Sequence, residues 1–159
     1  MMRGDIEGKK ILDPGCGTGV LSCGAKLLGA EYVLGIDVDK RAVEVAEKNA
    51  EKLKVDAEFL VSDIKSFECR HFDTVVMNPP FGAQNVHADR PFIDMALECS
   101  DVVYSVFNKG SLGFVKSYVK KRAEVTAAFS CSFPMKKTFS HHTKECVYID
   151  VEIVRMTKI

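Results

Sequence analysis

The chain has 159 residues, of which 47% are hydrophobic, and its 22 basic and 22 acidic side chains give a formal net charge of zero. This length and hydrophobic content are sufficient for a substantial packed core and exclude a largely disordered chain. No apolar run is long enough to span a membrane, and the first residues lack the apolar centre of a signal peptide. We therefore expect a cytoplasmic protein with a single domain over residues 1–159.

Apolar segments with the pattern of strands alternate with amphipathic segments along most of the chain. Repeated strand-helix-strand units indicate parallel pairing, whereas the last two strands have no helix between them and should pair antiparallel. We predict an α/β fold with a doubly wound, Rossmann-like sheet that is mostly parallel and has a C-terminal antiparallel strand pair. The predicted strands are residues 9–14, 31–39, 56–63, 72–78, 101–108, 123–133 and 146–158. The first predicted helix begins after the turn at 13–19 and ends at about residue 28. The other predicted helices are residues 39–53, 89–99 and 111–121.

The predicted helix at residues 39–53 shows the clearest amphipathic pattern, with Lys and Glu on its polar side. Asp39 is a plausible N-cap, because a short carboxylate can accept a bond from the first backbone N–H groups. The apolar face is predicted to consist of Ala42, Val45, Ala46, Asn49 and Leu53.

The six cysteines are scattered, and no two are spaced as Cys-x-x-Cys. We expect reduced, mostly buried thiols that act as small hydrophobic side chains. His141, His142 and Cys146 could approach a metal together, but one short cluster without further ligands does not predict a zinc site.

Charge is distributed unevenly along the chain. Residues 1–80 carry 11 basic and 14 acidic side chains, a balance of −3, whereas residues 81–159 carry 11 basic and 8 acidic ones, a balance of +3. Basic groups alternate with aromatic ones in the second half, which suits a nucleic-acid surface as well as an ordinary solvated one.

The glycine-rich segment "DPGCGTG", residues 13–19, lies between the first predicted strand and the first helix. Glycines such as Gly15 and Gly17 let the backbone turn sharply and lie close to a ligand, and the helix start offers free N–H groups. The spacing Gly-x-Gly-x-Gly differs from the dinucleotide pattern, and no Lys-Ser/Thr of a P-loop follows. Asp13, at the start of the turn, fits a cofactor with a cationic centre, such as S-adenosylmethionine.

Two further acids stand where the second and third predicted strands end. Asp37 could accept bonds from both hydroxyls of a ribose, and Asp63 could reach the edge of an adenine. Each could instead cap the element that follows it, or cap and bind at once.

The segment "MNPPFG", residues 77–82, forms a rigid corner at the end of the fourth predicted strand. That strand should neighbour the first one, so the corner should open on the same crevice as the glycine turn. The Asn78 side-chain carbonyl and the Pro79 backbone carbonyl could hold the two N–H bonds of a planar amine, Pro80 could stiffen the corner, and Phe81 could stack on the ring. The alternative is a tight turn with Phe81 in the core.

These motifs resemble a known class of enzymes. "DPGCGTG", "GIDVD", "VSD" and "MNPPFG" together resemble the class I S-adenosylmethionine-dependent amino-methyltransferases. "FDTVVMNPPFGAQN", "VYSVFNKGS" and "FPMKKTFSHHTKECVYIDVEIVRM" resemble more closely the methyltransferase-like 5 family, which methylates the N6 of adenine in small-subunit ribosomal RNA. The likeness covers essentially the whole chain, and it implies cofactor contacts by Asp13, Gly15, Gly17, Asp37 and Asp63 and adenine capture by Asn78, Pro79, Pro80 and Phe81.

The resemblance has implications beyond the catalytic corner. It implies a substrate-facing loop with Phe139, His141 and Lys144, and a small zinc-binding activator of the transfer-RNA methyltransferase 112 (Trm112) type. The third predicted strand should lie at a sheet edge, with Phe59 and Val61 on one side, and could pair with that partner. Family members also carry a further N-terminal segment over the cofactor, so we expect this chain by itself to bind the cofactor weakly.

Other functions are compatible with the same residues. The corner would also suit a guanine-N2 RNA methyltransferase or a protein glutamine-N5 methyltransferase, and the fold could serve as an inactive binding module. A nicotinamide dehydrogenase is disfavoured by the glycine spacing and by the lack of a Tyr-x-x-x-Lys motif.

Overall fold

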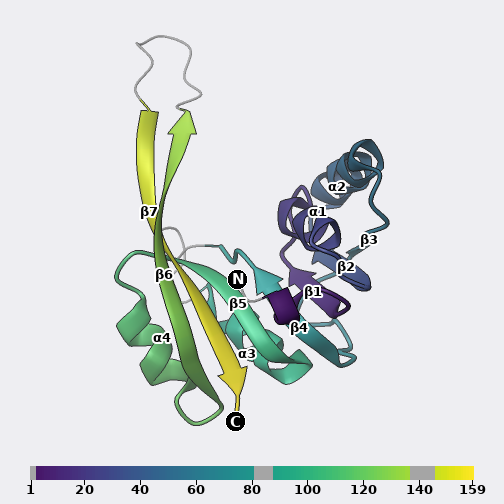
Figure 1. Cartoon of the computed structure of the whole chain (residues 1–159). Helices are drawn as coiled ribbons and strands as arrows, with labels where there is room; N and C mark the ends of the chain where they lie inside the picture. The colour runs from purple at the N-terminus through teal and green to yellow at the C-terminus, as the bar shows by residue number, and fades with distance from the viewer. Residues whose placement is uncertain (1–2, 81–87, 137–145) are drawn as a thin grey trace.

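A computed structural model describes residues 3–80, 88–136 and 146–159 of the chain (Figure 1). The described residues form one seven-stranded sheet with the strand order β3-β2-β1-β4-β5-β7-β6. Strands β1 to β5 run parallel, and β7 is antiparallel to both β5 and β6, which confirms the predicted sheet. The strands are β1 (Lys10–Pro14), β2 (Tyr32–Asp37), β3 (Glu58–Val61), β4 (Phe72–Met77), β5 (Ser100–Asn108), β6 (Ala123–Lys136) and β7 (Cys146–Lys158).

Helices cover the two faces of this sheet unequally. A short 3-10 helix η1 (Arg3–Asp5) precedes β1, and the α-helices are α1 (Val20–Leu27), α2 (Lys40–Leu53), α3 (Arg90–Cys99) and α4 (Leu112–Val119). On one face, α1 packs on β1, β2 and β4 through a cluster that contains Ala25, Ile11, Val33 and Val76. On the other face, α3 and α4 pack on a larger cluster that extends from Leu12 to Met156. We call these the α1 face and the α3 face. None of the described helices is both long and apolar enough to cross a lipid bilayer.

The parallel register brings the carboxyl ends of the first strands to one edge of the sheet. Leu12 of β1 pairs with Val75 of β4, so the glycine turn after β1 and the corner after β4 leave the sheet at the same height. Asp37 of β2 pairs with Val61 of β3, and Asp63 follows two residues later. The fold therefore brings the glycine turn, Asp37, Asp63 and Asn78 to one edge of the sheet.

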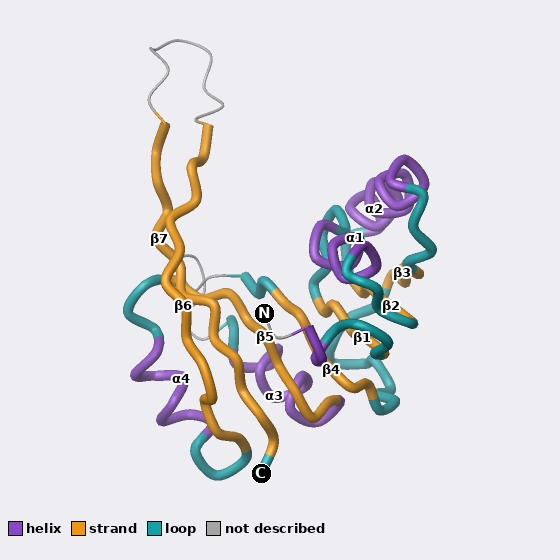
Figure 2. The backbone as a smooth tube through the Cα atoms, in the orientation of Figure 1, coloured by secondary structure: helices purple, strands orange, loops and turns teal. Residues whose placement is uncertain are grey.

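Strands β6 and β7 form a long hairpin that extends past this edge (Figures 1 and 2). Their pairing runs from Ala123 with Lys158 to Lys136 with Cys146, whereas the last pair of β5 with β7 joins Asn108 to Val151. Between this pair and the pair of Lys136 with Cys146, the described strands β6 and β7 therefore pair only with each other.

A partly buried ion pair fixes the N-terminal segment to the base of this hairpin. The Asp5 carboxylate accepts hydrogen bonds from Arg155 Nε at 2.9 Å and from the Tyr104 hydroxyl at 2.6 Å. The bond from Arg155 outweighs the opposing effect of burial and lowers the pKa of Asp5. This network joins η1, β5 and β7 on the α1 face.

The predicted apolar face of α2 is partly wrong. The structure buries Val43, Ala46 and Ala50, whereas Val45 is 41% and Leu53 50% exposed. The small side chain of Ala46 is needed where α2 approaches the start of α1, because a Cβ built on Gly19 would lie 2.9 Å from the Cβ of Ala46. The predicted N-cap is confirmed, since Asp39 Oδ1 accepts a bond from the Arg41 N–H at 2.9 Å.

The expectation of reduced thiols is wrong for two of the six cysteines. Cys69, in the connection between β3 and β4, forms a disulfide with Cys99 at the end of α3, and their Cα atoms are 5.6 Å apart. Folding brings together two residues that are 30 positions apart in the sequence. Cys16 and Cys23 are free and buried, as predicted.

Candidate active site

The glycine turn is fixed by the end of the neighbouring strand β2. The N–H groups of Gly15 and Cys16 both donate to the Ile36 carbonyl, at 2.8 and 3.0 Å. Gly15 has a φ of +71°, and a Cβ at this position would lie 2.9 Å from the Phe92 ring of α3. Only glycine therefore permits both this backbone conformation and the close approach of α3.

Asp37 connects the turn to the end of β2. Its Oδ2 accepts a bond from the Gly17 N–H at 2.8 Å, and its Oδ1 accepts one from the Asp39 N–H at 2.9 Å. An ionised carboxylate has about four lone-pair positions, so Asp37 retains acceptor capacity for a ligand. The helix cap is supplied by Asp39, and Asp37 positions the turn.

Asp63 caps a turn of its own. Its Oδ1 accepts a bond from the Lys65 N–H at 2.9 Å, and its backbone carbonyl accepts bonds from the N–H groups of Ser66 and Phe67 at 3.0 Å. The capping alternative is therefore correct for Asp63. Asp63 also lines the cavity described below, so the capping bond does not remove it from the candidate site.

Asp13 lies beneath the turn and is only 1% exposed. Its Oδ2 accepts a short bond from the Ser22 hydroxyl at 2.6 Å, while its Oδ1 has no hydrogen-bond partner. Burial disfavours the charged form and raises the pKa of Asp13 to about 7. A cationic ligand group near the turn would offset this effect and favour the ionised carboxylate.

The corner after β4 combines one buried and two exposed residues. Pro79 is buried and anchors the corner, whereas Asn78 and Pro80 are exposed. The described residues contain no cis peptide bond, so the rigidity of the corner comes from the fixed φ angles of its prolines. Phe81 lies outside the described residues, as do the predicted substrate residues Phe139, His141 and Lys144 and the possible metal ligands His141 and His142; of Cys146 only the backbone is described.

One cavity of about 640 Å³ unites the ends of four strands. Of the residues predicted for the site, it brings together Gly15, Asp37, Asp63, Asn78 and Pro80. Asp13, Gly17 and Pro79 do not line this cavity. They contact the residues that do line it. Asp13 is buried at the start of the glycine turn, Gly17 donates its N–H to Asp37, and Pro79 is the buried residue of the corner.

Sequence reasoning missed several residues that line this cavity. Val38 and Ile64 directly follow the two acids, and Val38 is 72% exposed, which is unusual for a valine at the end of a buried strand. Their positions, directly after an acid at a strand end, are the sequence signal that could have identified them as lining residues. Pro91 and Phe92 close the cavity from α3 and could not be found without the tertiary structure.

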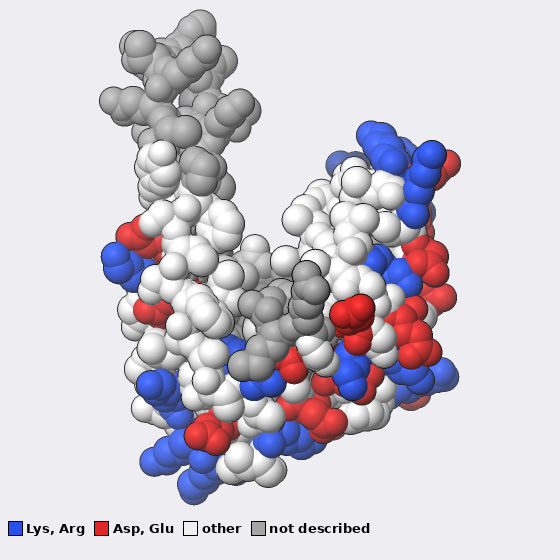
Figure 3. Space-filling model, viewed as in Figure 1, with Lys and Arg blue, Asp and Glu red and all other residues white. Residues whose placement is uncertain are grey.

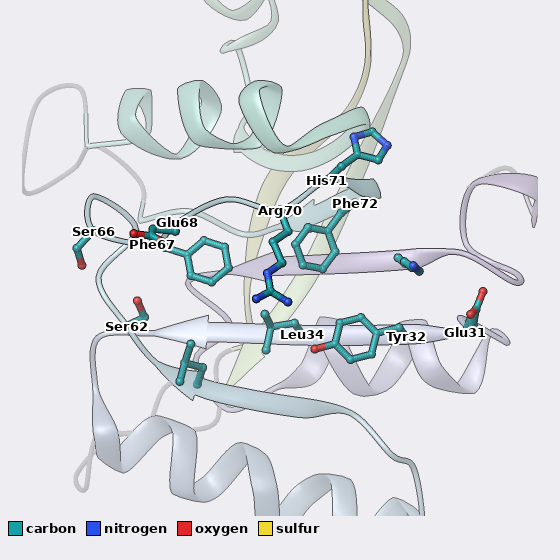
Figure 4. A pocket seen from close by; sticks show the side chains of 12 residues that line it. Glu31, Tyr32, Leu34, Ser62, Ser66, Phe67, Glu68, Arg70, His71 and Phe72 are labelled. Atoms are coloured by element: carbon teal, nitrogen blue, oxygen red, sulfur yellow. The ribbon is translucent and has the colours of Figure 1, made fainter.

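A second cavity, of about 780 Å³, lies on the α3 face at the β3 edge of the sheet (Figure 4). No helix covers this part of the sheet, because the described connection from β3 to β4 contains only turns. The rings of Tyr32 and Phe72 stack across it with centroids 6.4 Å apart, and Arg70 extends from the connection toward Leu34 on β2. None of the residues predicted for catalysis or cofactor binding lines this cavity.

The sheet order, the glycine turn and the acids at neighbouring strand ends define a class I methyltransferase. A family model for the methyltransferase small domain matches residues 2–144. A solved structure of PH1948 from Pyrococcus horikoshii, assigned as an RNA methyltransferase, superimposes with a TM-score of 0.87 at 42% identity, covering 98% of this chain and 78% of that one.

Curated relatives also match over nearly the full chain. The protein MJ0284 of Methanocaldococcus jannaschii is 38% identical, over 98% of this chain and 76% of its own length. The rRNA N6-adenosine-methyltransferase METTL5 of Danio rerio is 33% identical, over 96% of this chain and 77% of its own length. The chain belongs to the methyltransferase small domain family and, within it, to the METTL5 family, as the resemblance implied.

Proposed function

We propose that this chain transfers a methyl group from S-adenosylmethionine to the N6 amino group of an adenine in ribosomal RNA, acting as one domain in the cytoplasm. Nearly full-length kinship with METTL5 supports the reaction and the RNA substrate. The observation that carries the proposal is the single cavity shared by Gly15, Asp37, Asp63 and Asn78, because it unites acids that suit a nucleoside with a corner that suits an amine.

The described residues fit the cofactor. Asp37 would hold the ribose with its remaining lone pairs, and Asp63 would reach the adenine edge. Val38 and Ile64 offer apolar contacts to a flat base beside these acids. The unpartnered, buried Oδ1 of Asp13 fits a cofactor that brings positive charge to the turn.

The corner would act on the amine of the target base. Bound S-adenosylmethionine supplies an electrophilic methyl group on a positively charged sulfur. The Asn78 side-chain carbonyl and the Pro79 backbone carbonyl would accept the two N–H bonds of the adenine amine and position its nitrogen. With the nitrogen held there, the cofactor would supply the methyl carbon and leave as a neutral thioether, and one N6 proton would pass to water. A flipped or unpaired adenine is needed to reach this corner.

Methyl transfer from labelled cofactor to small-subunit ribosomal RNA, followed by mass spectrometry of the nucleosides, tests this proposal. The expected product is N6-methyladenosine. Labelled N2-methylguanosine, or label in a protein glutamine, would replace the proposal with one of the alternative enzymes. Cofactor binding without transfer to RNA or protein, with and without an activator subunit, would indicate a binding module.

We propose that the RNA-methylating form includes a small zinc-binding activator of the Trm112 type, paired with the edge strand β3. Three observations support this: β3 ends the sheet, its Leu60 and Val61 are 46% and 47% exposed, and the uncovered cavity of Figure 4 lies beside it. Phe59 packs inward against Gly35, so Leu60 is the apolar side chain of β3 on the cavity side. A partner strand would satisfy the free backbone groups of this edge and cover the exposed side chains.

Coexpression with such an activator and gel filtration test the partner. We expect a stable heterodimer, and Leu60→Lys should abolish it while leaving the monomer folded. Val45→Lys changes an apolar residue of similar exposure on α2; it is the matched control and should leave the heterodimer intact. A wild-type chain that remains monomeric beside the activator would contradict the proposal.

A further inference from the structure

The β6–β7 hairpin exposes two phenylalanine rings on one of its faces. Phe129 and Phe133 of β6 are each 49% exposed, with the smaller Cys131 between them. Alternation along the strand places all three side chains on the same face, opposite Ile153, Val151 and Ile149 of β7. Exposing two large rings on an extended hairpin has a cost in water, so their exposure points to a ligand.

This face is continuous with the candidate active site. Ile153 packs in the same cluster as Val76 of β4, which places the phenylalanines on the α1 face of the sheet. Met77, the residue before the corner, pairs with Ser105, and the next residue, Val106, pairs with Ile153. Phe129 therefore stands at the height of Asn78, three strands away, or about 14 Å at the usual strand spacing. Phe133 lies farther out, beyond the end of β5.

The two acids of β7 nearest the phenylalanines, Asp150 and Glu152, lie on the opposite face of the hairpin. Asp150 is bonded to the Ser132 hydroxyl and to Lys109, whose Nζ is 3.0 Å away, and Glu152 Oε2 accepts a bond from the Leu112 N–H of α4 at 3.0 Å. Both carboxylates thus point away from the phenylalanines. In Figure 3 the described part of the projecting strands shows few charged side chains above their base. These two acids therefore do not repel a polyanion from the two rings.

We propose that the Phe129–Phe133 face of the hairpin binds unpaired RNA next to the target adenine by stacking bases on the two rings. This inference rests on the proposed function, and it extends the site from a single base to its flanking nucleotides. Two residues four positions apart on a strand are separated by about 13 Å, far more than the 3.4 Å between stacked bases of one strand in a duplex. The two rings therefore suit bases that are splayed apart, as in loops and single strands.

Binding of a short single-stranded RNA tests the face independently of catalysis. The probe carries one adenosine flanked by 2-aminopurine, whose fluorescence is quenched on stacking, and affinity is measured by anisotropy without cofactor turnover. Base stacking tolerates any sequence, so the natural target site is not needed. Phe129→Leu and Phe133→Leu keep an apolar side chain without an aromatic face, whereas the Tyr variants keep the ring.

We expect each Leu variant to weaken binding about tenfold and to lose quenching, within the range for removing one stacked ring. The Tyr variants should bind like the wild type, and Tyr148→Ala, an aromatic that is 65% exposed on the opposite face, should change nothing. In the methylation assay the Leu variants should raise KM and leave kcat within about twofold.

Two results would overturn the inference. In the first, the Leu variants bind the RNA like the wild type. If these variants also fail to bind an activator subunit, the face is a protein interface. In the second, Tyr148→Ala is as damaging as they are. Failure of the proposed function is distinguishable, because a wild-type chain that methylates no RNA could still bind and quench this probe through the two rings.

Discussion

The two halves of the sheet differ in how completely their functional residues are fixed. In the β1–β3 half, short strands end in a glycine turn and acids whose carboxylates are already bonded to backbone N–H groups, such as Asp37 to Gly17. In the β5–β7 half, strands of 9 to 14 residues carry exposed rings such as Phe129 on a surface that no described helix covers. The first arrangement suits a small ligand of constant shape, and the second suits a long substrate that must enter and leave.

This contrast predicts that substitutions in the two halves affect different measured quantities. Changes at the strand ends of the first half should alter cofactor affinity. Changes on the hairpin should alter RNA affinity. The corner at Asn78 lies on β4, between the halves, and should alter the rate of methyl transfer itself.

The largest effect is expected for Asn78→Ala. Removing a positioned hydrogen-bond partner of the reacting group typically lowers kcat by about 10²- to 10³-fold. Cofactor affinity, measured by calorimetry, should stay within about threefold of the wild type. The control is Asp101→Ala, which removes an exposed polar side chain at the opposite end of the neighbouring parallel strand β5 and should retain full activity. A loss of less than tenfold for Asn78→Ala would remove Asn78 from the reaction.

Asp37→Asn should produce the next largest effect, and it should act on the cofactor. The change replaces a charged acceptor of the Gly17 N–H with a neutral amide, and hydrogen bonds to charged groups contribute about 1.5–3 kcal/mol. We expect a 10- to 100-fold higher Kd for S-adenosylmethionine by calorimetry. Asp73→Asn makes the same change to a comparable bond from the Lys10 N–H outside the cavity and serves as the control. Equal cofactor affinities for the two variants would contradict the assignment of Asp37.

The buried Asp13 should make the stability of the cofactor-free chain depend on pH. Because burial raises the pKa of Asp13 from 3.8 to about 7, the folded state holds this proton where the unfolded state releases it. Stability is greatest below the unfolded value and falls as the pH rises through 7, by about 1.4 kcal/mol between pH 6 and pH 8.

Urea unfolding at the two pH values checks this prediction against the Asp13→Asn variant. The variant should lose the dependence, because its amide does not titrate. A wild-type chain that is more stable at pH 8 than at pH 6 would reverse the sign and exclude a protonated Asp13.

The smallest effect is expected two residues from Asp37. Asp39→Ala removes the N-cap bond to the Arg41 N–H and should lower the free energy of unfolding by about 1 kcal/mol. Cofactor affinity should not change, because Asp39 does not line the cavity. A rise in the Kd for S-adenosylmethionine similar to that of Asp37→Asn would show that both acids at the end of β2 contribute to cofactor binding.

The sequence was sufficient for the features that local patterns encode. Strand alternation predicted β6 and β7 closely, and their lack of an intervening helix predicted the antiparallel pair. The acids at positions 37 and 63 were found because parallel strand ends gather at one edge, and both line the cavity.

Features that depend on close packing were not predictable in the same way. The buried face of α2 depends on the contact of Ala46 with Gly19, which hydrophobic spacing does not register. Phe92 closes the cavity from a helix that is more than 70 residues beyond the glycine turn. The depth of Asp13 and its unpartnered oxygen likewise appear only in three dimensions.

A crystal structure of the chain with a non-transferring S-adenosylmethionine analogue and adenosine would test the central claim most directly. The account predicts the analogue in the 640 Å³ cavity, with its ribose on Asp37, and the adenosine amine within hydrogen-bonding distance of Asn78 Oδ1. An analogue bound instead in the 780 Å³ cavity beside β3, or an adenosine amine directed away from Asn78, would contradict it.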